Sequence, residues 1–217
     1  LELLLWASVN SDDKRLKDIA LSHADKTMVH HFRRNYSSYH VVSYDTVTAI
    51  PHRKQTHQGY SDESSWSRGQ AWGLYGYTYL YRETGDERYL RQAVLIADYL
   101  LHHPNMPEDY IPYWDYDSPE IPDTYRDVSA ATIMASALID LSSFVDGDRV
   151  EQYSKVIATQ ILTLASPAYT AKLGENGCFI LKHSVGAYPL KSEVDVPLTY
   201  ADYYYLEALT KLKRKIH

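Results

Sequence analysis

Two stretches of the chain carry the same helical pattern. They are "RETGDERYLRQAV", residues 82–94, and "FVDGDRVEQYSKV", residues 144–156. Each joins an alanine- or aromatic-rich helix to a more charged amphipathic helix through a tight Gly-Asp turn, and "ASVNSDDKRLKDI" is a looser third copy without the glycine. The copies recur about every 60 residues. This spacing predicts an all-α chain of αα-hairpins in which the first helix is buried and the second faces outward.

Helical periodicity dominates the rest of the chain. It predicts helices over residues 11–32, with Ser11 as N-cap, and over 64–84, 86–101, 127–145, 149–165 and 198–214. The segments 36–60, 104–125 and 170–197 between them are rich in tyrosine, proline and histidine. Within the first of these, "SYHVVSYDTVTAI" alternates as a short strand or hairpin does. Because long polar-aromatic loops enter the buried helices, we favour a closed toroid with a pocket at one end over an open solenoid.

Charge, cysteine content and hydropathy exclude several classes of function. The net charge of −6 gives no basic surface for nucleic acid. No segment approaches the roughly 20 apolar residues that a membrane span needs. The single cysteine, Cys178, excludes an internal disulfide. The basic end "KLKRKIH" suits a solvated helix C-terminus, which favours cations.

Aromatic usage points to a polar cleft. Tyrosine occurs 21 times, against 3 phenylalanines and 4 tryptophans. Tyrosine and tryptophan combine a flat apolar face with a hydrogen-bonding edge. Such side chains suit a wet, aromatic-lined cleft, for which sugars are natural ligands.

The stretch "HQGYSDESSWSRGQAWGLYG", residues 57–76, opens a helix that holds Gly69, Gly73 and Gly76. Each interior glycine costs about 1 kcal/mol relative to alanine. We expect these glycines to let a neighbouring helix approach closely. Arg68 and Trp72 lie on an adjacent face, at i and i+4.

An arginine in the first turn of a helix opposes the helix dipole, so Arg68 needs an anionic partner or ligand. Asp62 or Glu63, just upstream, would serve as a structural partner, and Trp72 would then belong to the core. Asp127, before the helix expected at 127–145, is a candidate N-cap.

The 10 histidines show no metal-binding spacing, because His30-His31 and His102-His103 are adjacent pairs whose side chains diverge on a helix. His40 and His57-Gln58 are better candidates for a polar pocket, although such a residue alone is more often an ordinary loop residue than a ligand.

Four blocks of the sequence resemble one known family. "SSWSRGQAWGLYGYTYL", "RDVSAATIMASALIDL" and "VDVPLTYADYYYLEAL" look like segments of the unsaturated glucuronyl hydrolases, glycoside hydrolase family 88. The initial "LELLLWAS" looks like the segment that follows a "D-N-M-M-N" type motif in that family. The blocks keep the family order and span essentially the whole chain. The related unsaturated rhamnogalacturonyl hydrolases typically have "RGNGW" where this chain has "RGQAW", so they are the second choice.

The resemblance implies a fold, a substrate and a reaction. The fold is an (α/α)6 barrel, and the substrate carries a 4,5-unsaturated uronic acid at its non-reducing end, as products of polysaccharide lyases do. A carboxylic acid protonates C4, and water that the same group deprotonates adds to C5. The resulting hemiketal opens and expels the remaining saccharide without direct attack at C1. No cofactor or metal is implied.

The resemblance also implies roles for four residues. Gln58, Arg68 and Trp72 match the substrate-binding glutamine, arginine and tryptophan of the family, and His40 matches a pocket histidine that supports catalysis. Arg68 and Gln58 would hold the carboxylate and hydroxyls of the sugar. Trp72 would stack on the unsaturated ring, and His40 would hydrogen-bond near the reacting carbons.

One feature departs from the family pattern. The two catalytic aspartates of the family precede every block found here, and one belongs to the motif that would stand immediately before Leu1. Twelve helices need roughly 300 residues. We therefore expect residues 1–217 to be the C-terminal part of a single catalytic barrel domain, inactive by itself. A carbohydrate-binding remnant and a helical interaction module are the alternatives, and both a cytoplasmic and a periplasmic location fit.

Overall fold

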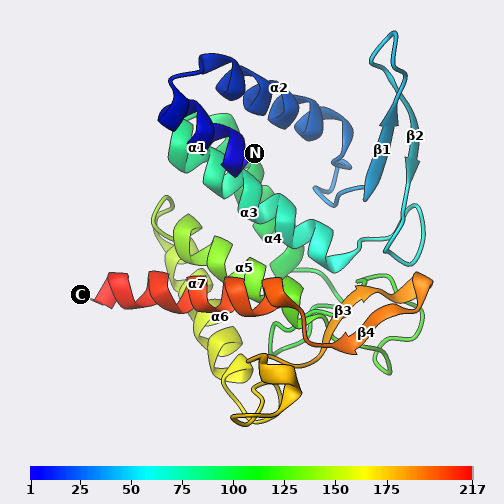
Figure 1. The fold of residues 1–217 in the computed structure, drawn as a ribbon, viewed down its shortest axis with the longest axis vertical. Helices are drawn as coiled ribbons and strands as arrows, with labels where there is room; N and C mark the ends of the chain where they lie inside the picture. Colours follow the sequence, from blue (N-terminus) through cyan, green and yellow to red (C-terminus); the bar gives the residue numbers. More distant parts are fainter. Residues whose placement is uncertain (217) are drawn as a thin grey trace.

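The computed structural model describes residues 1–216 as seven α-helices and two short β-hairpins (Figure 1). The helices are α1 (Glu2–Ser11), α2 (Lys14–His30), α3 (Ser67–Thr84), α4 (Glu87–Leu101), α5 (Val128–Leu141), α6 (Asp148–Leu164) and α7 (Thr199–Ile216). The strands are β1 (Val41–Tyr44), β2 (Pro51–Gln55), β3 (Ser184–Ala187) and β4 (Ser192–Val196), with short 3-10 turns at Asn176–Cys178 and Tyr188–Leu190.

Helical hairpins organise the chain, as the repeat predicts. Gly85 ends α3 and Gly147 precedes α6, both with positive φ (67° and 61°), a conformation that glycine adopts without strain. Helix α5 packs between α3 and α7, whereas α4 packs against α3 and α6 against α5 (Figure 1). The first helix of each of these hairpins is thus the inner one, which confirms the prediction.

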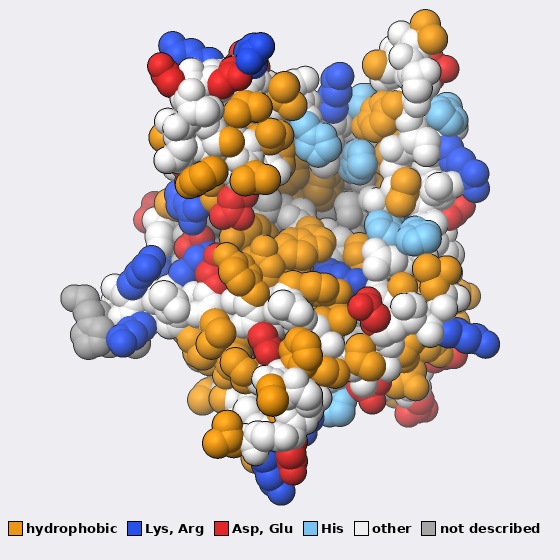
Figure 2. Space-filling view, in the orientation of Figure 1, with side chains coloured by type: hydrophobic (Ala, Val, Ile, Leu, Met, Phe, Trp, Pro, Cys, Tyr) orange, Lys and Arg blue, Asp and Glu red, His pale blue; other side chains and the backbone are white. Residues whose placement is uncertain are grey.

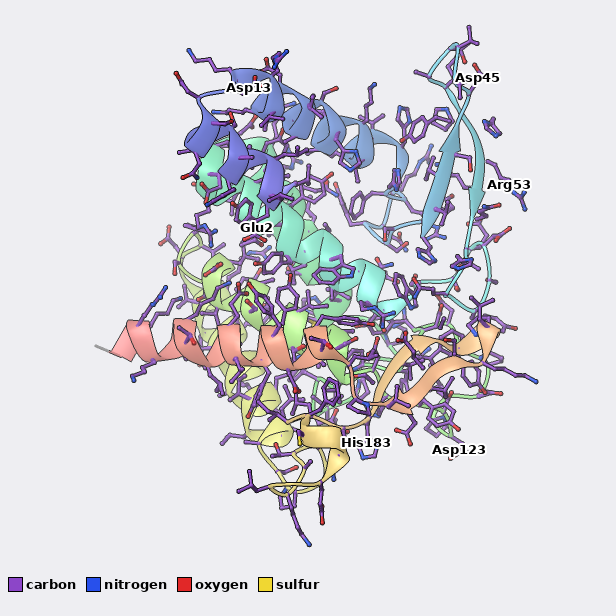
Figure 3. The ribbon with its side chains drawn as sticks, in the orientation of Figure 1. Glu2, Asp13, Asp45, Arg53, Asp123 and His183 are labelled. Atoms are coloured by element: carbon purple, nitrogen blue, oxygen red, sulfur yellow. The ribbon has the colours of Figure 1, made fainter. Side chains whose placement is uncertain are left out.

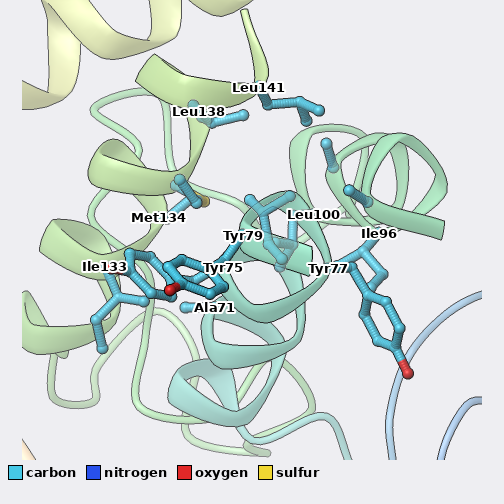
Figure 4. Close-up of a cluster of buried hydrophobic side chains, with 14 of the residues drawn as sticks. Ala71, Tyr75, Tyr77, Tyr79, Ile96, Leu100, Ile133, Met134, Leu138 and Leu141 are labelled. Carbon is cyan, nitrogen blue, oxygen red and sulfur yellow. The ribbon is translucent and has the colours of Figure 1, made fainter. Parts of the chain in front are cut away.

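Burial follows the same order. Every residue of α5 except Asp140 is buried, whereas α4 buries a single face. In Figure 4, Ile133 and Met134 of α5 lie near Ala71 and Tyr75 of α3, and Leu138 and Leu141 continue the same core cluster along α5. The core therefore forms along the inner helices, and the loops at one end are free to build a site.

The chain before α3 differs from the sequence prediction in two respects. Ser11 is the last residue of α1, and Asp13 caps α2 by accepting a hydrogen bond from the backbone N–H of Arg15. Asp13, and not Ser11, is the N-cap because its side chain reaches a free backbone N–H in the first turn of α2. The apolar sequence "LELLLWASVN" is typical of a buried helix, yet Leu3, Trp6 and Val9 of α1 are exposed and only Leu5 and Ser8 are buried.

The hairpins form in two of the segments expected to be irregular. Strand β1 lies within "SYHVVSYDTVTAI", which confirms the short strand predicted there, and it pairs antiparallel with β2, which follows that stretch. Strands β3 and β4 also pair antiparallel, inside residues 170–197, where no strand was predicted. Residues with positive φ flank or interrupt this second hairpin, including His183, Lys191 and Glu193, and they hide the period-2 pattern.

Among residues 1–216, none of the helices combines the length and hydropathy that a membrane crossing requires.

Candidate functional site

A cavity of about 370 Å³ opens between α2, α3 and the segment that leads into β1. Figure 2 shows the hollow below α2 and the β1–β2 hairpin, with histidine side chains on its wall and hydrophobic side chains deeper in. Its wall is formed by Leu1, His23, Thr27, His31, Phe32, Ser38, Tyr39, His40, Trp66, Gly69, Trp72, Gly73, Gly76 and Tyr77. A mixed aromatic and polar lining at this size is typical of small-molecule sites.

The glycines of α3 form one wall of this cavity. A Cβ at Gly76 would meet no atom within 4 Å, and one at Gly73 would lie 3.1 Å from the Phe32 ring. At Gly69 the nearest atom, at 2.9 Å, belongs to the Trp66 ring. The expectation that the glycines seat a neighbouring helix is therefore wrong. Because these glycines have no side chains, the rings of Phe32 and Trp66 and the open space of the cavity occupy the volume beside this face of α3.

Trp72 forms the boundary between this cavity and a smaller one of about 240 Å³. Its ring meets the ring of Tyr204 edge to face at 5.1 Å and that of Tyr75 at 6.4 Å. Glu2 and Tyr79 also line the smaller cavity, and in Figure 3 Glu2 lies between the ribbons of α1 and α7. Burial and the nearby Glu207 raise the pKa of Glu2. Trp72 is half-buried, as a ring that stacks on a ligand must be.

His40 lies on the opposite side of the cavity, before β1. Its Nδ1 accepts hydrogen bonds from the backbone N–H groups of His57 (3.0 Å) and Gln58 (3.1 Å). Its ring lies 4.3 Å from that of Trp66. Burial, together with His57 and Arg68, lowers the pKa of His40 to about 4, while the Gln58 side chain opposes this shift. The imidazole is therefore neutral near pH 7.

Arg68 has an anionic partner, but not one close in sequence. Its Nη1 donates to Asp127 Oδ2 at 2.7 Å, and both side chains are buried. Asp62 instead accepts from the backbone N–H of Thr56, and Glu63 pairs with Arg33. The alternative that pairs Arg68 with Asp62 or Glu63 is therefore wrong.

Asp127 performs two tasks with one carboxylate. As predicted, it caps α5, because its Oδ1 accepts from the backbone N–H of Ser129 at 3.1 Å. The same oxygen accepts from the Val185 N–H at 3.3 Å. Its Oδ2 binds Arg68. Asp127 therefore connects the N-termini of α3 and α5 to β3.

Gln58 and Arg68 converge on one backbone carbonyl. The oxygen of Gly186 accepts from Gln58 Nε2 at 2.8 Å and from Arg68 Nη2 at 2.6 Å. Arg68 Nη1 also donates to the Val185 carbonyl at 2.5 Å. Of the four residues implied by the resemblance, His40 and Trp72 line the cavity, whereas Gln58 and Arg68 lie behind it and bind the β3 strand.

Sequence reasoning missed part of the lining. Trp66 is the residue before α3, and its ring separates His40 from the cation of Arg68, whose Cζ lies 4.5 Å from the indole centroid. His23 and Thr27 of α2, and His31, which caps the C-terminus of α2, line the cavity. Their i, i+4, i+8 spacing places them on one helix face and was the available signal.

One buried carboxylate belongs to the loops beneath the cavity. Asp115 is fully buried, and burial raises its pKa. Its Oδ2 accepts from the Tyr60 N–H at 2.8 Å and from the Ser64 hydroxyl at 2.7 Å.

Within residues 1–216, no group of three or more His, Cys, Asp or Glu side chains is arranged to hold a metal ion.

Known proteins resemble the chain in both sequence and structure. No protein-family profile matches it. It is 45% identical over 217 residues to an unsaturated glucuronyl hydrolase of Formosa agariphila, an alignment that covers all of this chain and 53% of that protein. It is 32% identical over 212 residues to an unsaturated chondroitin disaccharide hydrolase of Streptococcus pyogenes, covering 97% of this chain and 53% of that protein.

A solved structure of an unsaturated glucuronyl hydrolase specific for heparin superposes on the chain with a TM-score of 0.95. The two are 49% identical, and the match covers 98% of this chain and 57% of that one. The pairing of inner and outer helices, together with this superposition, shows that the chain belongs to the class of (α/α)6-barrel proteins. Within this class the chain belongs to the unsaturated glucuronyl hydrolase family. It spans about half the length of the curated relatives it matches.

Proposed function

We propose that the whole protein containing this chain removes 4,5-unsaturated uronic acid from the non-reducing end of lyase-generated, glycosaminoglycan-type oligosaccharides. The observation that carries this proposal is the cavity between Trp72 and His40. Its volume of about 370 Å³ suits a sugar unit, and it offers an indole face, a neutral imidazole and a glycine wall. The relatives named for chondroitin disaccharides and for heparin support the same substrate class.

The reaction adds water across C4=C5. A carboxylic acid delivers a proton to C4 while positive charge develops at C5 and the ring oxygen, and water then bonds to C5. The C5 hemiketal opens and the aglycone leaves from C1. In this proposal the residues described here bind and orient the sugar within a single catalytic domain.

Each described residue has a physical role in this proposal. Trp72 stacks on the flat unsaturated ring, and His40 hydrogen-bonds to an oxygen of that ring or its carboxylate. Arg68 and Gln58 act mainly through Gly186, because their donors already bind its carbonyl. Arg68 also supplies positive charge behind Trp66, close to where an anionic sugar would lie.

The test is an absorbance assay on the whole protein. The conjugated C4=C5 chromophore of an unsaturated disaccharide disappears as the bond is hydrated. We expect loss of absorbance with disaccharides from chondroitin, hyaluronan or heparin, and none with saturated counterparts, whose spectra show the background. Loss only with lyase products of rhamnogalacturonan would favour the related family instead. No loss with any of these substrates would refute the proposed activity.

A further inference from the structure

The ring of His40 is held in one tautomer by the backbone. Two N–H groups, from His57 and Gln58, point at Nδ1 at 3.0 and 3.1 Å. A ring nitrogen that accepts hydrogen bonds cannot carry a proton, and in a neutral imidazole the proton then resides on the other nitrogen. The imidazole proton of His40 is therefore on Nε2.

The loop that supplies these N–H groups is itself fixed. At residue 56, the Thr56 N–H donates to Asp62 Oδ1 and the Thr56 hydroxyl accepts from Gly59 N–H, both at 2.8 Å. The Tyr60 N–H donates to the buried carboxylate of Asp115, also at 2.8 Å. Because both ends of the turn are anchored, the two amides cannot rotate away to let Nδ1 take the proton.

The Nε2 side of the ring remains available to a ligand. The ring lines the cavity and lies against Trp66. The contacts of His40 with the Thr56 hydroxyl and with the N–H groups of His57 and Gln58 are all made by Nδ1. A second proton is opposed by His57 from the loop, by Arg68 from α3 and by burial. A half-buried N–H donor at a cavity wall is suited to an acceptor oxygen.

We propose that His40 is a fixed Nε2–H donor to an acceptor oxygen of the bound sugar, and that Asp115 is a positioning residue that sets this tautomer through residues 56–60. This inference rests on the proposed function for the identity of the sugar. His40 then neither gives nor takes a proton in the hydration step near pH 7. It orients the unsaturated ring and stabilises negative charge on its oxygen atoms.

The tautomer can be observed without any substrate. In the whole protein labelled with ¹⁵N-histidine, long-range ¹H–¹⁵N correlation spectra distinguish Nε2–H, Nδ1–H and doubly protonated rings. His40→Asn identifies the His40 signal by its loss. We expect a neutral Nε2–H ring at every pH from 5.5 to 8. An Nδ1–H ring, or a doubly protonated ring at pH 6, would overturn the inference whether or not the protein hydrolyses sugars.

Two substitutions of His40 distinguish the role of Nδ1 from the role of Nε2. Asparagine places an acceptor where Nδ1 lies, whereas glutamine places a donor near Nε2. We expect His40→Asn to keep the melting temperature but to weaken unsaturated-disaccharide binding about tenfold, the effect of one lost hydrogen bond to ligand. We expect His40→Gln to bind more tightly than His40→Asn and to melt earlier. The reverse order of affinities would contradict the donor role.

Asp115→Asn tests the positioning role. Its amide nitrogen faces the Tyr60 N–H in one orientation and the Asp117 N–H in the other, so one backbone hydrogen bond is lost in either case and the turn loosens. We expect a mixture of His40 tautomers in the sugar-free spectrum and a raised KM. Ser64→Ala, a milder change, should shift the spectrum in the same direction. Unchanged His40 signals in both variants, even with a lower melting temperature, would show that Asp115 has a purely structural role.

Discussion

Arg68 and Asp127, 59 positions apart in the chain, form a buried ion pair in which Nη1 and Oδ2 are 2.7 Å apart. Arg68 belongs to the first turn of α3, and Asp127 caps α5. Both also bind β3, Arg68 through the carbonyls of Val185 and Gly186 and Asp127 through the N–H of Val185. Two inner helices and the second hairpin therefore meet at this one pair, directly behind the wall formed by Trp66.

Removing the charge of Asp127 should destabilise the protein strongly. Asp127→Asn leaves Arg68 as a buried cation with only neutral carbonyl and hydroxyl partners, and breaking a buried pair in this way costs about 3–5 kcal/mol. Urea unfolding of wild type and variant measures the difference. Glu83→Gln, in the half-exposed Arg82–Glu83 pair, is the control and should cost less than about 1 kcal/mol. A loss below 1 kcal/mol for Asp127→Asn would contradict the structural role of the pair.

The glycines of α3 should respond differently to alanine. A methyl group at Gly76 enters open space, so Gly76→Ala should raise the free energy of unfolding by about 0.5–1 kcal/mol through helix propensity. A methyl group at Gly73 would lie 3.1 Å from Phe32, so Gly73→Ala should gain less or lose stability. Thermal or urea unfolding of the two variants gives the comparison. A greater stabilisation by Gly73→Ala would show that Phe32 does not fill this site.

Acid should weaken the fold through two histidines. Burial lowers the pKa of both His31 and His40 from an ordinary 6.5 to about 4. Between these values the unfolded chain binds more protons than the folded one, so their stabilising contribution is complete above pH 6.5 and falls as the pH drops toward 4. Because both rings are half-buried, we expect a loss on the order of 1 kcal/mol per histidine after allowing for solvent screening.

Urea unfolding at pH 7.5 and pH 5 measures this loss. His31→Gln, which cannot titrate, isolates one of the two contributions. The loss between the two pH values should be smaller in this variant than in wild type. An equal loss in both proteins would show that His31 titrates normally in the fold.

Trp72 should contribute more to sugar binding than to stability. It is half-buried at the boundary of two cavities, so Trp72→Ala removes a stacking face with modest loss of core. A lost aromatic stacking contact of about 1–2 kcal/mol corresponds to a weakening of disaccharide affinity of roughly 5–30-fold. Calorimetric titration of the whole protein measures it. Tyr125→Ala is the control, because Tyr125 is a 40% exposed aromatic at a different cavity. Similar affinities for the two variants would exclude Trp72 from the site.

The helical hairpins were predictable from the sequence, because glycines at 85 and 147 mark turns between periodic segments. The β3–β4 hairpin was not, since residues such as Glu193 and Asp195 adopt positive φ and break the alternation. The sequence shows that Gly69, Gly73 and Gly76 share one face of α3. Whether this face meets a helix or a cavity depends on where α2 and Phe32 pack. Likewise, Arg68 needed an anion, yet only the fold brings Asp127 to it. Local sequence patterns therefore predict most of the helices, whereas the arrangement of the site depends on contacts between residues far apart in the sequence.

The central claim is that the cavity beside the α3 glycines receives the unsaturated sugar. The most direct measurement is the rate of C4=C5 absorbance loss in the whole protein after this cavity is filled. Gly76→Leu adds a side chain where no atom lies within 4 Å, so the fold should tolerate it while the sugar is excluded. Ala168→Leu, which fills a separate cavity, is the control. We predict near-complete loss of activity for Gly76→Leu and wild-type activity for Ala168→Leu; full activity in a folded Gly76→Leu protein would place the substrate elsewhere.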